Sequence, residues 1–298
     1  TSAGVVNEAI NTVSSNVAII NSNLVVGYTD TTAGRPAYVY STNGTVWTDR
    51  VDAGILTMNP DWFSNFGTSA TGYAVMSDRG LYSFTLGNDF TLVVAAVYPS
   101  TETVKAFFSW KISASAFGLF VLTDKSMYES NSTPNAFSPW ENFSGANCAL
   151  PVNNYLYVGV GDKGGVTEFF RDVNGDLQSG KGGLDQGDGM ASPSAISALT
   201  YSSDGYLYAR TLAGDVFKRL CAPFTPEEGW HAVMTFSGVN DTTTVIAVSN
   251  ADDAMTRVHV PHKASSTTDT LYFVMEGGTQ EFENGGYVIW PEPVFSNT

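Results

Sequence analysis

Apolar and polar residues alternate along most of the chain in short runs, and turns rich in Gly, Asn, Asp and Ser separate these runs. The clearest example is GYAVMSDRGLYSF, residues 72–84, in which two apolar runs flank the four-residue turn Ser77–Gly80. Alternation with a period of two is typical of half-buried strands, and Asp and Gly tolerate the backbone angles of a tight turn. The stretch therefore predicts a β-hairpin.

This hairpin outline occurs six times, and its six copies begin with the aromatic residues Tyr38, Tyr73, Phe120, Tyr157, Tyr208 and Tyr272. The intervals are 35, 47, 37, 51 and 64 residues, with a mean of about 47. Repeats of about 40–50 residues built from strands are typical of propellers whose blades are small antiparallel sheets. We therefore predict an all-β fold, a single β-propeller of six blades. Five or seven blades also fit, because the 64-residue interval can hide a missed or merged blade.

The first 23 residues have a different pattern. Apolar residues recur there at steps of three and four, which permits an amphipathic helix, although the Ser, Thr and Asn between them are poor helix formers. The alternative is a first propeller strand, VAIINSNLVVGY, preceded by a tether. We assign residues 1–16 to an N-terminal tether or assembly segment and residues 17–298 to the propeller. The stretch resembles the Asn/Thr/Val/Ile-rich connectors of phage tail fibres and tail spikes, which implies assembly between chains.

Residues 41–47, STNGTVW, lie in the first hairpin. They resemble the Asp box, a motif close to S-x-D-x-G-x-T-W on the blade hairpins of sialidase-like and related propellers. This copy is one residue short and carries Asn43 at the Asp position, and Ser203-Asp204-Gly205 begins a second, looser copy. The polar side chains of such a box bond to the backbone of their own turn, so the resemblance implies a fold element and not catalysis.

Composition narrows the range of partners. Charged residues make up 14% of the 298 residues, against about 25% in an average domain. This polar but weakly ionic character fits a virion-exposed or extracellular protein. The net charge is −15, and the 14 Lys and Arg residues form no basic run, which argues against nucleic acid as a partner. No apolar run approaches the ~18 residues of a membrane span, so we expect no membrane insertion.

One segment suggests a metal. Asp172, Asn174 and Asp176 place oxygen-bearing side chains at alternate positions, as calcium loops do. They resemble the D-x-N-x-D start of dockerin and integrin-type propeller loops, which implies calcium as a cofactor. The segment departs from those loops in having Leu177 where Gly makes the sharp turn, and it lacks a Glu at position twelve. A hairpin without metal is the alternative, because Asn-Gly favours a two-residue turn. The sequence indicates no other cofactor.

Four tryptophans are candidates for ligand contact, because an exposed indole ring can stack on the face of a sugar. These are Trp62, Trp110, Trp140 and Trp230, all near the expected ends of strands or loops. The alternative for each is packing between neighbouring blades. Two cysteines, Cys148 and Cys221, either form one bridge between blades or are small buried residues, and the sequence leaves both open.

A sialidase-like glycosidase is the main enzymatic alternative. The resemblance to that family implies three arginines for a substrate carboxylate, a Tyr paired with a Glu as nucleophile, and an acidic Asp. The chain has seven arginines, of which Arg35 precedes the box-like turn and resembles the first arginine motif of the family. No Ser-His-Asp order, phosphate-binding glycine loop or Rossmann fingerprint is present in a suitable context. We therefore expect a protein that is not an enzyme.

The sequence thus favours a non-enzymatic β-propeller on a virion or extracellular surface. It would act as a structural, receptor-binding or glycan-binding component, with other structural proteins of an assembly or a surface glycan or receptor as partners. A secreted glycan-active enzyme and a free propeller lectin are the alternatives, since a fold alone does not choose between them.

Overall fold

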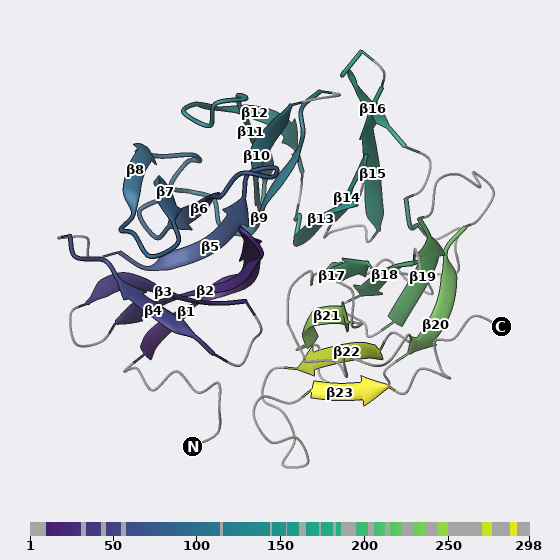
Figure 1. Ribbon diagram of the computed structural model, residues 1–298. Helices are drawn as coiled ribbons and strands as arrows, with labels where there is room; N and C mark the ends of the chain where they lie inside the picture. The colour runs from purple at the N-terminus through teal and green to yellow at the C-terminus, as the bar shows by residue number, and fades with distance from the viewer. Residues whose placement is uncertain are drawn as a thin grey trace. The chain divides into compact units, whose positions relative to one another are not determined.

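The computed structural model describes residues 10–30, 34–42, 46–54, 58–113, 116–143, 145–152, 154–160, 165–172, 174–180, 183–185, 195–201, 206–211, 215–221, 229–235, 243–249, 270–275 and 287–290. Every regular element in these residues is a β-strand, so the all-β prediction is confirmed (Figure 1). Within the same residues, no helix is long and apolar enough to cross a membrane. The chain divides into two compact units, Thr1–Asn142 and Phe143–Thr298.

The first unit contains three antiparallel sheets, each made of four strands that follow one another in the sequence. The first sheet consists of β1 (Ile10–Ile20), β2 (Asn23–Asp30), β3 (Arg35–Ser41) and β4 (Thr48–Val51). The second consists of β5 (Pro60–Asn65), β6 (Thr71–Met76), β7 (Leu81–Thr85) and β8 (Thr91–Val94). The third consists of β9 (Val104–Lys111), β10 (Phe117–Thr123), β11 (Ser126–Ser130) and β12 (Phe137–Asn142).

The second unit repeats this plan in its described residues. One sheet consists of β13 (Cys148–Val152), β14 (Tyr155–Gly159), β15 (Val166–Arg171) and β16 (Leu177–Ser179). The next consists of β17 (Ile196–Tyr201), β18 (Tyr206–Thr211), β19 (Asp215–Leu220) and β20 (His231–Thr235). A three-stranded sheet consists of β21 (Thr243–Ser249), β22 (Thr270–Met275) and β23 (Tyr287–Trp290).

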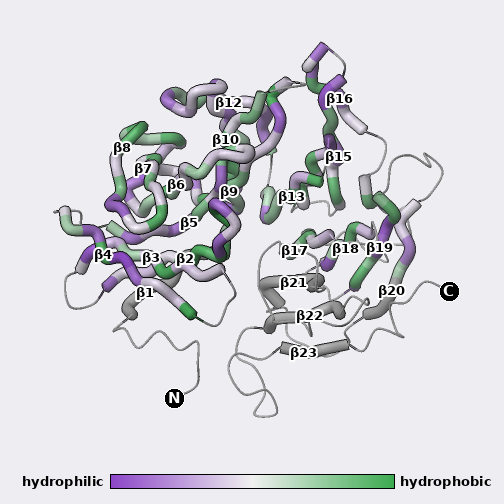
Figure 2. The backbone as a smooth tube through the Cα atoms, viewed as in Figure 1, coloured by the Kyte–Doolittle hydropathy of each residue, from purple (hydrophilic) through white to green (hydrophobic). Residues whose placement is uncertain are grey.

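Within each unit the sheets are arranged as propeller blades are. The first strand of each sheet lies against the first strand of the next, β1 against β5 and β5 against β9, and likewise β13 against β17 and β17 against β21. The fourth strands β4, β8, β12 and β16 are the most exposed of their sheets. Figure 2 shows hydrophobic and hydrophilic residues alternating within the sheets, as expected when both faces of a blade pack on neighbours.

Aromatic side chains fill the space between the first two sheets. Phe63 of β5 and Phe84 of β7 meet edge to face with ring centroids 5.6 Å apart, and both side chains are buried. Gly27 of β2 lies directly against Phe63, and a Cβ atom at this position would be 2.2 Å from the ring. Only a glycine therefore allows β2 and β5 to approach so closely.

The six predicted hairpins lie in six different sheets, but the first was assigned one strand too late. Tyr73, Phe120, Tyr157, Tyr208 and Tyr272 all lie on the second strand of their sheets, whereas Tyr38 lies on the third strand, β3. The equivalent residue of the first sheet is Tyr28 on β2. Its interval to Tyr73, from position 28 to position 73, is 45 residues. The error arose because Asn43-Gly44 is a stronger turn signal than the actual β2–β3 connection.

The N-terminal apolar pattern belongs to a strand and not to a helix. β1 begins at Ile10, seven residues before the predicted boundary at Val17. The pairing of β1 with β2 shifts twice, between Ile10 and Val13 and between Val13 and Val17, so three or four residues of β1 stand opposite two residues of β2. These bulges explain apolar residues at steps of three and four in a strand. Residues 1–9 of the predicted tether lie outside the described residues.

Candidate functional site

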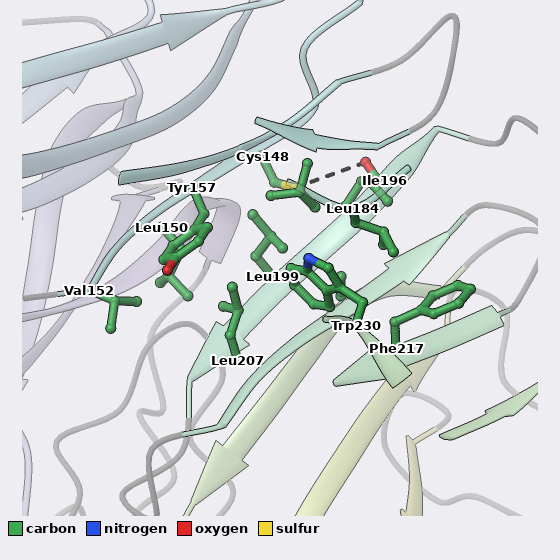
Figure 3. Close-up of a cluster of buried hydrophobic side chains, with 12 residues drawn as sticks. Cys148, Leu150, Val152, Tyr157, Leu184, Ile196, Leu199, Leu207, Phe217 and Trp230 are labelled. Carbon is green, nitrogen blue, oxygen red and sulfur yellow. Dashed lines mark hydrogen bonds between the residues drawn. The ribbon is translucent and has the colours of Figure 1, made fainter. Parts of the chain in front are cut away.

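Two of the four candidate tryptophans are buried. Trp110 has 2% of its surface exposed, and Trp230 has 4%. Figure 3 shows the Trp230 ring among Leu199, Leu207 and Phe217, which belong to the apolar cluster between the β13–β16 and β17–β20 sheets. An indole ring at this depth offers no face to a sugar, so these two residues correspond to the packing alternative.

The other two tryptophans are half-buried. Trp140 of β12 packs edge to face against Trp110 with centroids 6.3 Å apart, and against Phe120 at 5.9 Å. Trp62 of β5 packs against the apolar cluster that contains Val97 and Phe107. The structure thus brings Trp110 and Trp140 together and leaves Trp62 and Trp230 in separate clusters.

The predicted calcium segment forms a tight hairpin loop held by Asp172. Its Oδ1 atom accepts hydrogen bonds from the backbone N–H groups of Asn174 and Asp176, each at 2.9 Å. Gly175 adopts the left-handed backbone with φ of 86°, as a turn of this kind requires. One of the three presumed oxygen ligands is therefore used by the loop's own backbone. No group of three or more His, Cys, Asp or Glu side chains able to hold a metal occurs in the described ranges.

The two cysteines are free thiols with separate partners. Cys148 is buried, and its thiol lies 3.9 Å from the carbonyl oxygen of Ile196 (Figure 3). The Cys221 thiol donates to the hydroxyl of Tyr157 at 3.4 Å. The alternative of one bridge between blades is wrong, and both residues act as small buried or half-buried side chains.

A polar cluster links the β13–β16 and β17–β20 sheets. Arg219 of β19 donates to the Glu168 carboxylate of β15 at 2.8 Å, and the Glu168 side chain is only 6% exposed. Tyr157 stands directly opposite Glu168 on β14. Burial raises the pKa of Tyr157, and the Cys221 thiol and Glu168 carboxylate add to this effect. The cluster joins one Arg, one Tyr and one Glu, the residue types of the glycosidase alternative, in a buried position.

A second polar cluster, which the sequence patterns did not indicate, lies at one end of the β5–β8 sheet. Because the sheet is an antiparallel meander, the start of β5, the β6–β7 turn and the β8–β9 loop all lie at this end. The pairing of β5 with β6 shifts between Pro60 and Trp62, so Asp61 is the extra residue of a β-bulge. Bulges re-aim side chains and are enriched beside functional sites. The described residues include no hydrogen-bond donor to the Asp61 carboxyl.

Asp61 is therefore a half-buried acid with an unusual titration. Burial, and secondarily the negative charge of Asp78, raise the pKa of the Asp61 carboxyl to about 6. Asp78 lies in the Ser77–Gly80 turn, where it accepts hydrogen bonds from the N–H of Gly80 at 2.8 Å and from the hydroxyl of Tyr82 at 2.9 Å. Tyr98, on the β8–β9 loop, has a pKa raised to about 12 by burial and by the charge of Asp61.

The β8–β9 loop is held from both sides by equivalent turns. Arg79 of the β6–β7 turn donates to the carbonyl of Tyr98 at 3.2 Å, and the N–H of Val97 donates to the carbonyl of Arg79 at 3.0 Å. Lys125 of the β10–β11 turn donates to the carbonyl of Thr101 at 2.7 Å. Asp124 of the same turn binds the Thr103 N–H through its carboxylate and the Thr103 carbonyl through its own N–H.

Two further contacts at this end come from equivalent tyrosines. Tyr82 and Tyr128 each lie four residues after the aspartate of their turn. Tyr82 donates to Asp78, and Tyr128 donates to Glu102 of the β8–β9 loop at 3.0 Å. We call this end of the β5–β8 and β9–β12 sheets the turn face. It comprises the β6–β7 turn, the β10–β11 turn and the loop between β8 and β9. Aligning the two turns, SDRGLY and TDKSMY, would have located it from the sequence.

Comparisons with solved structures show the β-propeller fold. PorZ, a surface component of the type-IX secretion system of Porphyromonas gingivalis, matches with a TM-score of 0.59 and 12% identity, over 95% of this chain and 41% of PorZ. The Cps50 (Swd1) β-propeller domain of Myceliophteria thermophila matches with a TM-score of 0.54 and 9% identity, over 88% of this chain and 80% of that domain. The periplasmic gluconolactonase PpgL of Pseudomonas aeruginosa matches with a TM-score of 0.54 and 14% identity, over 92% of this chain and 84% of PpgL.

At these identities the likeness establishes the fold alone. The chain spans about two fifths of PorZ. The three proteins differ in their stated roles, and one of them is an enzyme, so the fold does not select a function. No protein-family model and no curated protein sequence matches the chain.

Proposed function

We propose that the protein is a non-enzymatic propeller of a virion or extracellular surface, a structural component that recognises a receptor or glycan through the turn face. The observation that carries this proposal is the double anchoring of the β8–β9 loop by Arg79 and Lys125. A loop fixed in this way presents its exposed Pro99 and Ser100 with little conformational entropy left to lose on binding. Binding residues concentrate on loops that a rigid scaffold positions.

The glycosidase alternative is supported by one observation, the meeting of Tyr157, Glu168 and Arg219. A nucleophilic hydroxyl and its partner must reach the substrate. Tyr157 is 2% exposed and Glu168 is 5% exposed, and both lie between two sheets. This burial favours a structural role for the cluster. The resemblances to Asp-box propellers and to phage fibre connectors remain part of the proposal, and the central residues of both box-like copies lie outside the described residues.

Two measurements test the proposal. The first is the native mass of the protein as isolated, by light scattering: a defined oligomer or a place in a larger particle supports a structural component. The second is binding of the intact protein to a glycan array and to host-cell surfaces. A monomer without glycan or cell binding would contradict the proposal and direct attention to glycosidase assays.

A pair of matched variants locates the binding surface. Ser100→Arg places a bulky cation on the β8–β9 loop of the turn face, whereas Ala70→Arg places the same side chain on the β5–β6 connection at the opposite end of the β5–β8 sheet. Both positions are exposed, so neither change disturbs the core. We expect Ser100→Arg to abolish binding and Ala70→Arg to preserve it. The reverse result would place recognition on the other end of the sheet.

A further inference from the structure

A methionine sulfur lies beside the polar contacts of the turn face. Met58 precedes β5, and its Sδ atom lies 3.0 Å from the hydroxyl oxygen of Tyr82 on β7. The same hydroxyl lies 2.9 Å from the Oδ2 atom of Asp78 in the β6–β7 turn. A hydroxyl group has one proton, and a carboxylate is a stronger acceptor than a thioether. Tyr82 therefore donates to Asp78, and the sulfur is a weak second acceptor.

Direct contacts lead from this hydroxyl to the β8–β9 loop. The Oδ1 atom of Asp78 accepts the N–H of Gly80 at 2.8 Å, which fixes the turn. Arg79, between these two residues, donates to the Tyr98 carbonyl at 3.2 Å, and its own carbonyl accepts the Val97 N–H at 3.0 Å. Arg79 has a φ of 71°, which is strained for a residue with a side chain, so the turn depends on these bonds to keep its shape.

The backbone next to Met58 is bonded to the same turn. The Ser77 N–H donates to the Asn59 carbonyl at 2.9 Å, and the Asn59 N–H donates to the Ser77 hydroxyl oxygen at 3.0 Å. Met58 thus reaches the turn through its side chain and through its neighbour in the chain. A displacement of Met58 is therefore passed to the turn by two routes.

Met58 is also the accessible residue among the methionines whose side chains the structure describes. It is half-buried, whereas Met76 and Met127 both have 0% of their surface exposed. The buried part of Met58 packs against the apolar cluster between the first two sheets, which contains Phe63 and Phe84. Peroxides oxidise accessible thioethers, and the product is a polar sulfoxide.

We propose that Met58 is a reversible oxidation site whose sulfoxide loosens the turn face. The oxidant is hydrogen peroxide. The sulfur donates an electron pair to one peroxide oxygen, so an S–O bond forms as the O–O bond breaks. The proton of the transferred oxygen passes to the departing hydroxide, which leaves as water. Two thiols reverse the step through a methionine sulfoxide reductase, which forms a disulfide and releases the oxygen as water.

The new oxygen changes the contacts of the sulfur. A sulfoxide oxygen accepts hydrogen bonds more strongly than a thioether does, so it competes with Asp78 for the Tyr82 proton. It does not fit between the sulfur and the hydroxyl at their separation of 3.0 Å, because an O–H···O bond alone needs about 2.7 Å between its oxygens. The polar group also packs poorly against the apolar cluster. Oxidation therefore displaces Met58 and weakens the hold of the turn on the β8–β9 loop.

Limited oxidation of the intact protein tests the site itself. The protein is treated with dilute hydrogen peroxide, and peptide mass spectrometry follows the addition of one oxygen to each methionine. We expect Met58 to be oxidised at least about tenfold faster than Met76 and Met127. Equal rates at the three positions would overturn the proposal.

Amide hydrogen exchange tests the consequence without any knowledge of a partner. Residues 77–80 and 95–103 report on the turn and the loop, and both should exchange faster after oxidation. Residues 66–70, at the other end of the β5–β8 sheet, should show no difference. Treatment with a methionine sulfoxide reductase and a thiol should restore the original protection. Complete oxidation of Met58 with unchanged protection would overturn the proposal.

Variants assign the response to one sulfur. Met58→Leu keeps an apolar side chain of similar size, so it should keep the protection of the wild type and lose the response to peroxide. Met127→Leu is the matched control and should respond as the wild type does. Met58→Gln brings a polar group to the same place and should loosen the loop without peroxide. A full peroxide response in Met58→Leu would overturn the proposal, and the wild-type measurements decide it if this variant does not fold.

The effect of oxidation on recognition rests on the proposed function, and the two can fail separately. If the turn face recognises a glycan or receptor, the oxidised protein should bind it more weakly, and the reductase should restore binding. A loosened loop with unchanged binding would contradict recognition through the turn face and support the oxidation site. An unloosened loop would overturn the oxidation proposal whatever the protein binds.

Discussion

Arg79 and Lys125 occupy equivalent positions in successive hairpins, and both donate to backbone carbonyls of one loop, at Tyr98 and Thr101 respectively. The two cations thus stabilise the connection between β8 and β9 from the sheet before it and from the sheet after it. Each cation uses an N–H donor to hold the loop and keeps its positive charge, because the acceptor is a neutral carbonyl. This arrangement links the repeat of the sequence to the rigidity of the surface that we propose for recognition.

Removing the Arg79 side chain should loosen the β8–β9 loop and lower stability. Its hydrogen bond to the Tyr98 carbonyl is partly buried, and bonds of charged donors contribute about 1.5–3 kcal/mol. We expect Arg79→Ala to lower the free energy of unfolding by about 1–2 kcal/mol, measured by urea denaturation. Lys125→Ala, at an exposed bond, should cost less than about 0.5 kcal/mol. Equal losses in the two variants would contradict the burial argument.

The contribution of Asp61 to the free energy of unfolding should rise as the pH falls from about 6 toward 4. The pKa of Asp61 is raised to about 6 in the folded protein from an ordinary value of 3.8, so the folded state binds this proton more tightly than the unfolded state does. Proton binding by Asp61 therefore stabilises the folded state increasingly as the pH falls from its folded-state pKa to its unfolded-state pKa. This stabilisation is lost as the pH rises again through the folded-state pKa.

Denaturation midpoints measured at several pH values check this dependence. Asp61→Asn should be more stable than the wild type at pH 8 and should show a weaker rise between pH 6 and pH 4. Other acidic groups titrate in the same range, so the difference between the two proteins, and not the wild-type curve alone, is the decisive quantity. A constant difference across this range would remove Asp61 as its source.

The fold could be predicted because its signal is local and repeated. Alternation, turn residues and the aromatic beginning of each second strand recur in every sheet, and each copy can be recognised within about a dozen residues. The one misplaced copy, at Tyr38, followed a strong turn dipeptide into the wrong pair of strands. The bulged start of β1 was misjudged for a related reason, because bulges change the period on which the interpretation depends.

The candidate site could not be predicted because it depends on contacts between segments far apart in the sequence. Burial decides whether a tryptophan packs or binds, and the residues near Trp110 and Trp230 give no local sign of it. The raised pKa of Asp61 results first from burial of its carboxyl group and second from the charge of Asp78, seventeen positions further along the chain. For Asp172 the sequence pattern pointed to a site that the contacts do not require. Its spacing from Asn174 and Asp176 suggested a metal, whereas its carboxylate accepts hydrogen bonds from the backbone of its own loop.

A methyl group at position 27 should disrupt the packing of the first two sheets. The Cβ of Gly27→Ala would lie 2.2 Å from the buried Phe63 ring, which other aromatic rings hold in place. Overpacking of this kind costs about 1–3 kcal/mol. Gly34→Ala is the matched control: its Cβ meets nothing within 4 Å, but its φ of 63° disfavours alanine and should cost about 1 kcal/mol. Thermal unfolding of both variants gives the comparison, and a milder effect at position 27 would contradict it.

The buried Glu168–Arg219 pair should be sensitive to loss of one partner and tolerant of loss of both. Glu168→Ala leaves the Arg219 charge without its carboxylate between two sheets, and breaking a buried pair costs about 3–5 kcal/mol. The double variant Glu168→Leu with Arg219→Met should recover much of this loss, because no buried charge remains. Denaturation in low and high salt measures both effects. A salt-dependent loss below about 1 kcal/mol would mean that the pair behaves as an exposed one.

Calcium removal provides the last prediction, because the sequence left a calcium loop and a plain hairpin open. In the structure the Asp172 carboxylate accepts two backbone N–H groups, so the loop has an internal anchor. We expect EGTA to leave the melting temperature unchanged and Asp172→Ala to lower stability by about 1 kcal/mol, as loss of a capping side chain does. Asp176→Ala separates the two readings: among the described residues its carboxylate makes no hydrogen bond or ion pair, so we expect this change to matter only if calcium binds. A fall in melting temperature with EGTA that Asp176→Ala abolishes would establish the calcium loop instead.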